Sequence, residues 1–155
     1  MDSVDHFPVT EFACHAYTAP DGYHPAESYP QEWEADRLSA LKRTLEVIRI
    51  ACGSQPVTIL CGYRSVAYNV ELRRRGLQGE RHATGVALHS QHTEGRAADI
   101  QVFGLDTRVL HSTIVKLYED GQVPELGGLG LYATLGFVHI DTFKDPSRNL
   151  RRWNG

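Results

Sequence analysis

The sequence lacks any apolar stretch near the roughly 20 residues that a helix needs to cross a bilayer. It also lacks an excess of basic charge, since 16 lysines and arginines stand against 19 acidic residues and the formal net charge is -3. A chain with that balance has no electrostatic attraction to the phosphates of a nucleic acid. We therefore expect neither a membrane nor a nucleic acid as a partner.

Cysteine is scarce as well. Cys14, Cys52 and Cys61 form an odd set, and no two of them have the CxxC spacing of a thiolate zinc site. A disulfide scaffold is not expected from such a set, and we predict that the three thiols are reduced and mostly buried. The first ten residues have neither the basic nor the apolar segment of a signal peptide, so the chain as written is not expected to be exported by one. The cellular location stays open.

What is present fits one compact domain. A chain of 155 residues with 41% hydrophobic residues is long enough to bury a sizeable core. We expect a single domain over residues 1–155, and a monomer. Residues 1–30 are rich in proline, aromatic residues and turn formers, which predicts an irregular arm packed on that domain.

Hydrophobic periodicity and capping residues predict both helices and strands. The expected elements are a helix from about 31 to 52, a strand over 57–61, a helix capped by Ser65 and running through Arg75, a strand over 97–103, a helix capped by Asp106 and ending at Gly121, and a hairpin of strands over 127–132 and 136–141. Residues 77–93 have no clean period and predict a long loop. Because no regular strand-helix-strand repeat is present, the predicted class is α+β, with a small, mostly antiparallel sheet flanked by helices.

Three side chains have the types and the spacing of a metal site. His92 and Asp99 lie seven residues apart, and Gly95 allows a turn between them. His139 stands in the middle of a strand that would pair with the strand holding Asp99. Two imidazoles and one carboxylate, with a fourth position left to water, are typical of catalytic zinc. A single histidine is more often a core or surface residue, so the trio is a hypothesis at this point.

The motif SQHTEGRAADI, followed by GGLGLY and GFVHID and preceded by CGYRS, resembles the zinc D-alanyl-D-alanine carboxypeptidase family. That family comprises peptidoglycan peptidases and is related to lysostaphin-type enzymes and to the hedgehog domain. The resemblance runs from about residue 7 to residue 153, and it implies one zinc ion in a cleft on the sheet, held by His92, Asp99 and His139. It also implies that Arg64 steadies the substrate or the developing oxyanion and that Ser90 lines the cleft.

The resemblance fails at the general base, which a zinc peptidase needs for proton transfer. Relatives carry a histidine two positions, or an acid three positions, before the last ligand, where this chain has Phe137 and Gly136. Asp141 is the nearest substitute, since strand geometry places it on the face of the last ligand, about 7 Å along. Orienting an imidazole or an arginine is its competing role. Glu125 and His89 could also reach the site.

Together these features predict a zinc-dependent peptidase of bacterial or phage origin that hydrolyses peptidoglycan stem or cross-bridge peptides. It would act as a D,D-carboxypeptidase or an endopeptidase, including the endolysin type. Tyr132, on the strand facing the last ligand, is expected either to line the substrate pocket or to pack in the core. The missing base keeps an alternative open, a non-catalytic zinc module that recognises cell-wall peptide or a protein partner.

Overall fold

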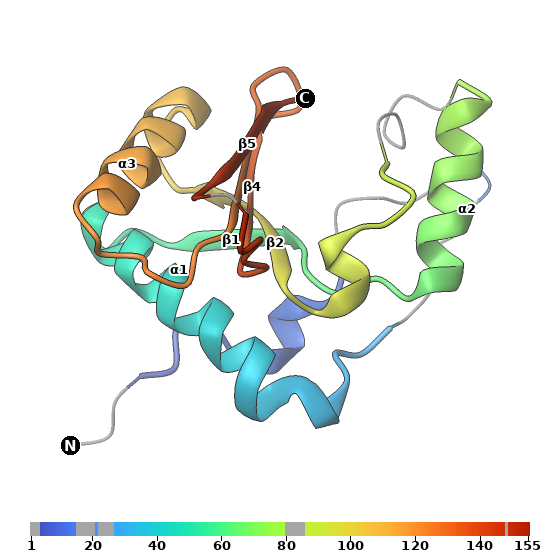
Figure 1. Ribbon diagram of the computed structural model, residues 1–155, viewed down its shortest axis with the longest axis horizontal. Coiled ribbons are helices and arrows are strands. Elements are labelled where there is room, and N and C mark those ends of the chain that lie inside the picture. Colours follow the sequence, from blue (N-terminus) through green and yellow to red (C-terminus); the bar gives the residue numbers. More distant parts are fainter. Residues whose placement is uncertain (1–3, 15–20, 22–26, 80–85, 148) are drawn as a thin grey trace.

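The computed structural model describes residues 4–14, 21, 27–79, 86–147 and 149–155 (Figure 1). Parts of the expected N-terminal arm (1–3, 15–20 and 22–26) and of the expected loop (80–85) lie outside the described residues. No helix among the residues described is long and apolar enough to cross a membrane.

The helices and strands follow the order that the sequence predicts, with one strand added. The elements are α1 (Ser39–Ala51), β1 (Val57–Cys61), α2 (Val66–Leu77), β2 (Ala97–Val102), α3 (Thr107–Glu119), β3 (Gly128–Tyr132), β4 (Phe137–Asp141) and β5 (Arg151–Asn154). The added strand is β5. Short 3-10 turns span Val9–Phe12, Gln31–Trp33 and Gln91–Glu94.

Two helix ends confirm the capping analysis. The Ser65 hydroxyl accepts a hydrogen bond from the Tyr68 backbone N–H at the start of α2, and the Asp106 carboxylate accepts one from Arg108 at the start of α3. The first helix is less regular than expected, because a 3-10 turn and a π-helical turn over Glu34–Leu38 precede α1. In that wide turn the Ser39 hydroxyl donates to the carbonyl of Glu34, which supplies a side-chain partner for a backbone acceptor.

The sheet has five strands in the order β1-β2-β4-β3-β5. All neighbours are antiparallel except β3 and β5, which are parallel. The predicted β3–β4 hairpin is confirmed, and so is the α+β class with a mostly antiparallel sheet. The parallel β5 closes the edge that the hairpin would leave open.

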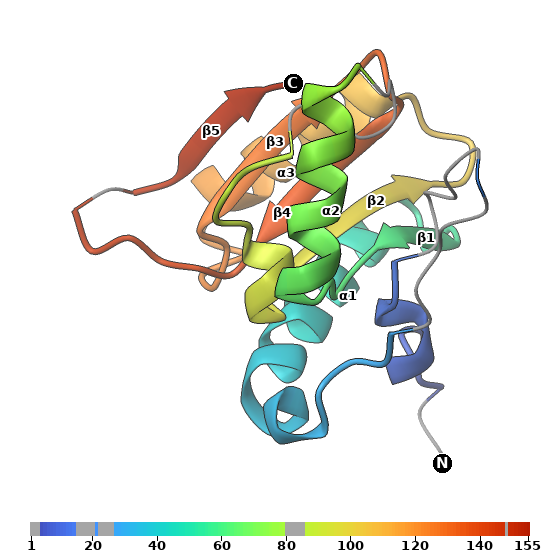
Figure 2. The ribbon, with the colours of Figure 1, turned by 90° about the vertical axis from the view of Figure 1, so that its right-hand side faces the viewer.

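Helices lie on both sides of this sheet. In Figures 1 and 2, α1 and α3 cover one face, while α2 stands on the other side. The core lies between the sheet and the α1–α3 pair and includes Leu41, Leu45, Ile48, Ile100, Leu110, Ile114, Leu129, Val138 and Ile140. Because side chains alternate along a strand, residues 99, 139 and 141 point to the opposite face, toward α2. Polar chemistry and core packing therefore occupy opposite faces of the same strands.

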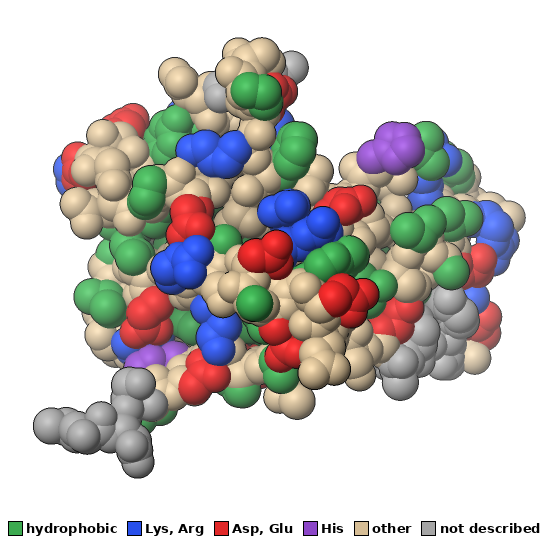
Figure 3. All heavy atoms as spheres, turned by 60° about the horizontal axis from the view of Figure 1, so that its bottom comes forward, with side chains coloured by type: hydrophobic (Ala, Val, Ile, Leu, Met, Phe, Trp, Pro, Cys, Tyr) green, Lys and Arg blue, Asp and Glu red, His purple; other side chains and the backbone are tan. Residues whose placement is uncertain are grey.

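The outer surface carries charges of both signs. Figure 3 shows acidic and basic side chains intermixed on the face that it displays. Surface ion pairs include Lys42 with Asp5, at 2.9 Å, and Arg43 with Glu125, at 2.8 Å. The distribution agrees with the nearly balanced composition.

Candidate metal centre and cleft

One cross-strand row brings most of the predicted site together. Asp99 on β2 pairs with Cys61 on β1 on one side and with His139 on β4 on the other. Antiparallel partners project to the same face, so these three side chains stand next to one another. His92 joins them from the turn just before β2, where Gly95 adopts a left-handed conformation, with φ of 67°, that ends the turn and starts the strand.

The two imidazoles bracket the Asp99 carboxylate. His92 Nε2 lies 3.2 Å from Asp99 Oδ2, and His139 Nδ1 lies 3.1 Å from Asp99 Oδ1. The imidazole rings are 5.1 Å apart and nearly perpendicular. All three side chains are buried. Imidazoles and a carboxylate are donor types that zinc prefers, and each imidazole here contacts the carboxylate.

The hydrogen bonds behind the cluster also suit a metal. The other nitrogen of His92, Nδ1, lies 2.6 Å from the carbonyl oxygen of Gly62. A carbonyl only accepts, so Nδ1 carries the proton and Nε2 is left with a lone pair facing Asp99. Histidines that bind metals are commonly held in this way by a backbone carbonyl or a carboxylate. The residues present therefore fit a zinc ion.

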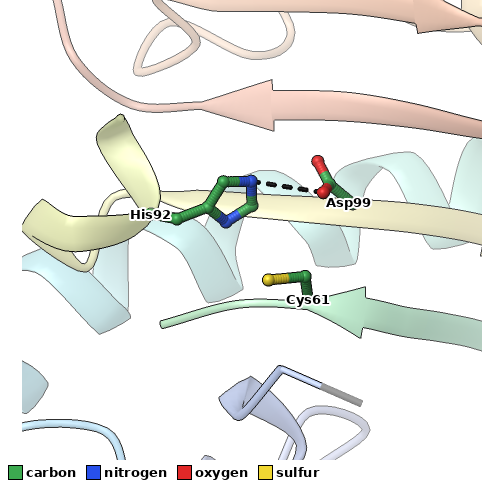
Figure 4. Close-up of side chains that lie close together, drawn as sticks. All are labelled: Cys61, His92 and Asp99. Carbon is green, nitrogen blue, oxygen red and sulfur yellow. Dashed lines mark ion pairs between the residues drawn. The ribbon is translucent and has the colours of Figure 1, made fainter. Parts of the chain in front are cut away.

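Cys61 is a neighbour that the sequence analysis left out of the site. Figure 4 shows its sulfur, from β1, on the same side as His92 and Asp99, and ligand atoms of these three residues all lie within 4.8 Å of one another. Its register opposite Asp99 is the reason for this closeness. Among the described residues this set meets that distance limit, and the predicted set with His139 in place of Cys61 does not. The structure therefore offers Cys61 as a third donor beside the predicted His139.

Burial and charge set the protonation of the cluster. Burial opposes ionisation of Asp99, but His92 and His139 hold the pKa of its carboxyl well below its usual range. Burial lowers the pKa of His92. Burial would also lower the pKa of His139, but its hydrogen bonds to Asp141 and Asp99 raise that pKa to about 9. The carboxylate is therefore ionised, and His92 favours its neutral form.

Asp141 occupies the next site-facing position on β4 and is completely buried. Its Oδ2 lies 2.9 Å from His139 Nε2, and its Oδ1 accepts a hydrogen bond from the Phe143 backbone N–H at 3.1 Å. The same Oδ1 forms a short ion pair with Arg151 on β5. All of these contacts join Asp141 to groups that hold it in place, and one of them is a predicted metal ligand.

Two glycines on β3 make room for these groups. A Cβ at Gly128 would overlap the Asp141 carboxylate and the Arg151 guanidinium. A Cβ at Gly130 would lie 2.5 Å from the indole nitrogen of Trp153 on β5. Gly128 and Gly130 therefore leave space on this face of β3 for the side chains of Arg151 and Trp153 from β5.

Aromatic residues form one wall of the site. The Trp153 indole N–H donates to the Tyr132 hydroxyl at 2.8 Å, and the Trp153 ring is 5.0 Å from that of His139. Tyr132 in turn stacks on Phe137 with 4.6 Å between ring centres. Of the two roles left open for Tyr132, the structure places it on the wall of the cleft.

Arg64 and Ser90 stand on the opposite wall. Arg64 donates from Nη2 to Ser90 Oγ at 3.1 Å, and the same hydroxyl accepts from the His92 backbone N–H at 3.2 Å. The Arg64 Nε is buried and has no hydrogen-bond partner among the residues described. Its guanidinium is therefore positioned by protein contacts while part of its donor capacity is left for a ligand.

A cavity of about 380 Å³ connects these walls. Its lining comprises Arg64, Val86, Ala87, His89, Ser90, Gln91, His92, Asp99, Tyr132, Phe137, His139, Asp141, Arg151 and Trp153. Of the two further base candidates, His89 lines the cleft. Glu125 does not line it, because both of its carboxylate oxygens bind Arg43 on α1, at 2.8 Å each.

The sequence analysis missed Arg151, Trp153 and the role of the glycines. A signal was present, since Gly128 and Gly130, like Arg151 and Trp153, are spaced two apart and so share one face of a strand. The spacing gains this meaning only once β5 is known to pair with β3.

Comparison with known proteins agrees with this architecture. The model of a family described as Peptidase_M15_2, peptidoglycan L,D-endopeptidase MepK, matches residues 32–153. A probable peptidoglycan L,D-endopeptidase MepK of Haemophilus influenzae is 31% identical over 99 residues, which are 64% of this chain and 43% of that protein. The MepK of Escherichia coli K12 is 35% identical over 95 residues, 61% of this chain and 43% of its own length.

These alignments span less than half the length of the curated relatives. No solved structure matches the chain. The family model covers most of the sequence, including both motif segments and β5. The chain therefore belongs to the Peptidase_M15_2 family, within the zinc D-alanyl-D-alanine carboxypeptidase-like group that its motifs resemble.

Proposed function

We propose that this protein is a zinc-dependent peptidase that hydrolyses a peptide bond in peptidoglycan, and that it acts as an L,D-endopeptidase. The observation that carries the proposal is the buried cluster of His92, Asp99 and His139 at the base of a cleft, in a chain of this peptidase family. The names of its relatives support the endopeptidase type over the carboxypeptidase type.

The zinc ligands in this proposal are His92, Asp99 and His139, one ion per chain. When bound, zinc polarises the scissile carbonyl and makes water a nucleophile at neutral pH. His139 is preferred over Cys61 because Asp141 buttresses its imidazole at 2.9 Å, an arrangement typical of metal-binding histidines. Cys61 has no comparable carboxylate behind it among the described residues.

Arg64 is the proposed electrostatic partner of the reaction. Its guanidinium, fixed by Ser90, has a free buried donor in a cleft where oxyanion charge would develop. Preorganised donors in a water-poor site stabilise such charge without reorganising. Tyr132 and Trp153 would bound the substrate on the other side, since their hydrogen bond holds both rings against the cleft.

Asp141 is proposed to position His139 and not to act as the general base. Its carboxylate is fully buried and already binds a backbone N–H, an imidazole and a guanidinium. His89, the other imidazole lining the cleft among the described residues, is the proposed proton carrier. The non-catalytic zinc module remains the alternative, because position 137 holds no histidine and position 136 no acid, which are the usual bases in relatives.

Digestion of purified sacculi tests the proposal. The zinc-loaded protein is expected to separate cross-linked muropeptides and to create new termini at an L,D bond, as identified by mass spectrometry. His92→Ala and a chelator-treated sample serve as inactive controls. Release of single terminal amino acids would instead indicate a carboxypeptidase, and binding to sacculi without any new termini would favour the non-catalytic module.

The same proposal treats residues 1–155 as one domain that acts as a monomer on peptidoglycan peptides. Sedimentation of the purified protein over a range of concentrations measures the oligomeric state directly. A constant mass near 17.3 kDa is the expected result.

A further inference from the structure

A second buried cluster adjoins the metal centre and shares Cys61 with it. Cys14, Cys61, Tyr68 and Leu72 form a small buried cluster beneath α2, separate from the main core. Cys14 belongs to the N-terminal arm and Cys61 is the last residue of β1. Neither thiol has a part in the proposed reaction.

The backbone holds the two cysteines opposite each other. Cys14 and Cys61 form an isolated antiparallel bridge. The flanking hydrogen bond from the Gly62 N–H to the Ala13 carbonyl, at 3.1 Å, marks them as a pair that does not exchange its own hydrogen bonds. In pairs of this kind the Cα atoms are about 4.5 Å apart and the side chains project to the same face. A disulfide requires a Cα separation of about 4.4 to 6.8 Å.

The two side chains belong to one buried cluster. Cys14 and Cys61 are only 7% and 3% exposed. Cys52, the third cysteine, lies at the C-terminal end of α1 and belongs to neither bridge nor cluster. The arrangement therefore singles out one pair from three thiols.

We propose that Cys14 and Cys61 are a redox modification site that forms an intramolecular disulfide with a small-molecule disulfide as oxidant. One cysteine attacks the oxidant, forming a mixed disulfide and releasing one thiol. The second cysteine attacks that mixed disulfide, closing the Cys14–Cys61 bond and releasing a second thiol. The two protein thiols are oxidised, the oxidant is reduced to two thiols, and the two protons pass to the departing thiolates.

The bond would have two structural effects. It would fasten the N-terminal arm to β1 immediately before Gly62, whose carbonyl holds His92 at 2.6 Å. It would also commit the Cys61 sulfur, which now lies within 4.8 Å of the donor atoms of His92 and Asp99, to Cys14. In the oxidised form a metal could take only nitrogen and oxygen donors from this cluster. Formation of the disulfide does not depend on the proposed peptidase activity.

The test uses oxidised glutathione, the wild-type chain and the Cys52→Ser variant. After incubation and alkylation, the variant is expected to have no free thiol and a mass lower by two hydrogens, and non-reducing peptide mapping should recover the Cys14–Cys61 link. The wild type should keep one alkylated thiol, on Cys52. Dithiothreitol should reverse the change. Because the closed loop is long, the oxidised form should melt several degrees higher than the reduced form.

The Cys14→Ser variant is the matched control and should show no rise in melting temperature after the same treatment. Persistence of both thiols in the Cys52→Ser variant, glutathione retained on both cysteines, or a disulfide that involves Cys52 in the wild type would overturn the proposal. None of these measurements reads peptidase activity, so an inactive protein would leave the result intact.

Discussion

Replacement of Asp141 by asparagine separates a positioning role from a proton-transfer role. Asn has nearly the same shape as Asp, so the change removes the negative charge and turns one oxygen into a donor. In the structure that charge faces His139 on one side and Arg151 on the other. The variant therefore weakens the support of His139 and leaves the guanidinium without its anion.

Two magnitudes follow from these contacts. Loss of a carboxylate that orients a metal-binding histidine typically weakens metal affinity by about 10- to 100-fold. Stability should also fall by about 2 kcal/mol, the scale of a hydrogen bond to a charged group. A larger loss of stability, on the scale of breaking a fully buried ion pair, is not expected. The reason is that the Arg151 side chain remains 20% exposed and also donates a hydrogen bond to the Phe143 carbonyl at 3.1 Å.

The assay measures zinc affinity by competition with a chelator, the midpoint of urea unfolding, and turnover at limiting and at saturating zinc. Asp141→Asn is expected to bind zinc more weakly and to recover most of its activity when zinc is added. Asp106→Asn makes the same chemical change at the N-cap of α3, where asparagine caps as well as aspartate, so it should be neutral. Wild-type zinc affinity together with a loss of turnover of about 100-fold would refute the reasoning and make Asp141 the base.

Three further predictions address the rest of the site. His139→Ala should lose stoichiometric zinc while Cys61→Ser retains it, as measured by metal analysis, and the opposite result would make Cys61 the third ligand. Arg64→Lys should keep its fold and its zinc but lose about 30-fold or more in kcat/KM, since an ammonium cannot reproduce the planar guanidinium, and unchanged kinetics would remove it from the reaction. Gly128→Ala should lower the free energy of unfolding by about 1–3 kcal/mol, and a denaturant midpoint equal to that of the wild type would contradict the steric argument.

Local signals were sufficient for most of the fold. Caps at Ser65 and Asp106 and the alternation along 57–61 and 97–102 depend on neighbours in the chain, so the sequence alone predicts them. Strand β5 was not predicted because four residues, RRWN, have no readable period. It is defined by parallel pairing with β3, a contact between distant segments that no local pattern encodes.

The site also divides into residues that local signals predict and residues that distant contacts place. The alternation of side chains along a strand and a single turn at Gly95 relate His92, Asp99 and His139, so their spacing in the sequence predicts that they lie close together. Cys61 was not among the predicted metal ligands, because the cysteines lack the spacing of a thiolate zinc site. Its place beside Asp99 comes from the pairing register of β1 and β2, which has an irregularity between Ile59 and Cys61 that the sequence does not predict.

Strand β3 also shows how a segment without reactive side chains can shape a reactive site. Gly128 and Gly130 lie on β3, between β4 and β5, against the side chains of Asp141, Arg151 and Trp153, and contribute only backbone there. That bareness lets Arg151 reach Asp141 and lets Trp153 cover His139 from the neighbouring strand. Any larger side chain at either glycine would separate β5 from the histidine it covers. The candidate metal-binding face of the sheet therefore requires small residues at alternate positions of β3. The core face requires large apolar residues, and Leu129 and Leu131, which alternate with the glycines, pack there.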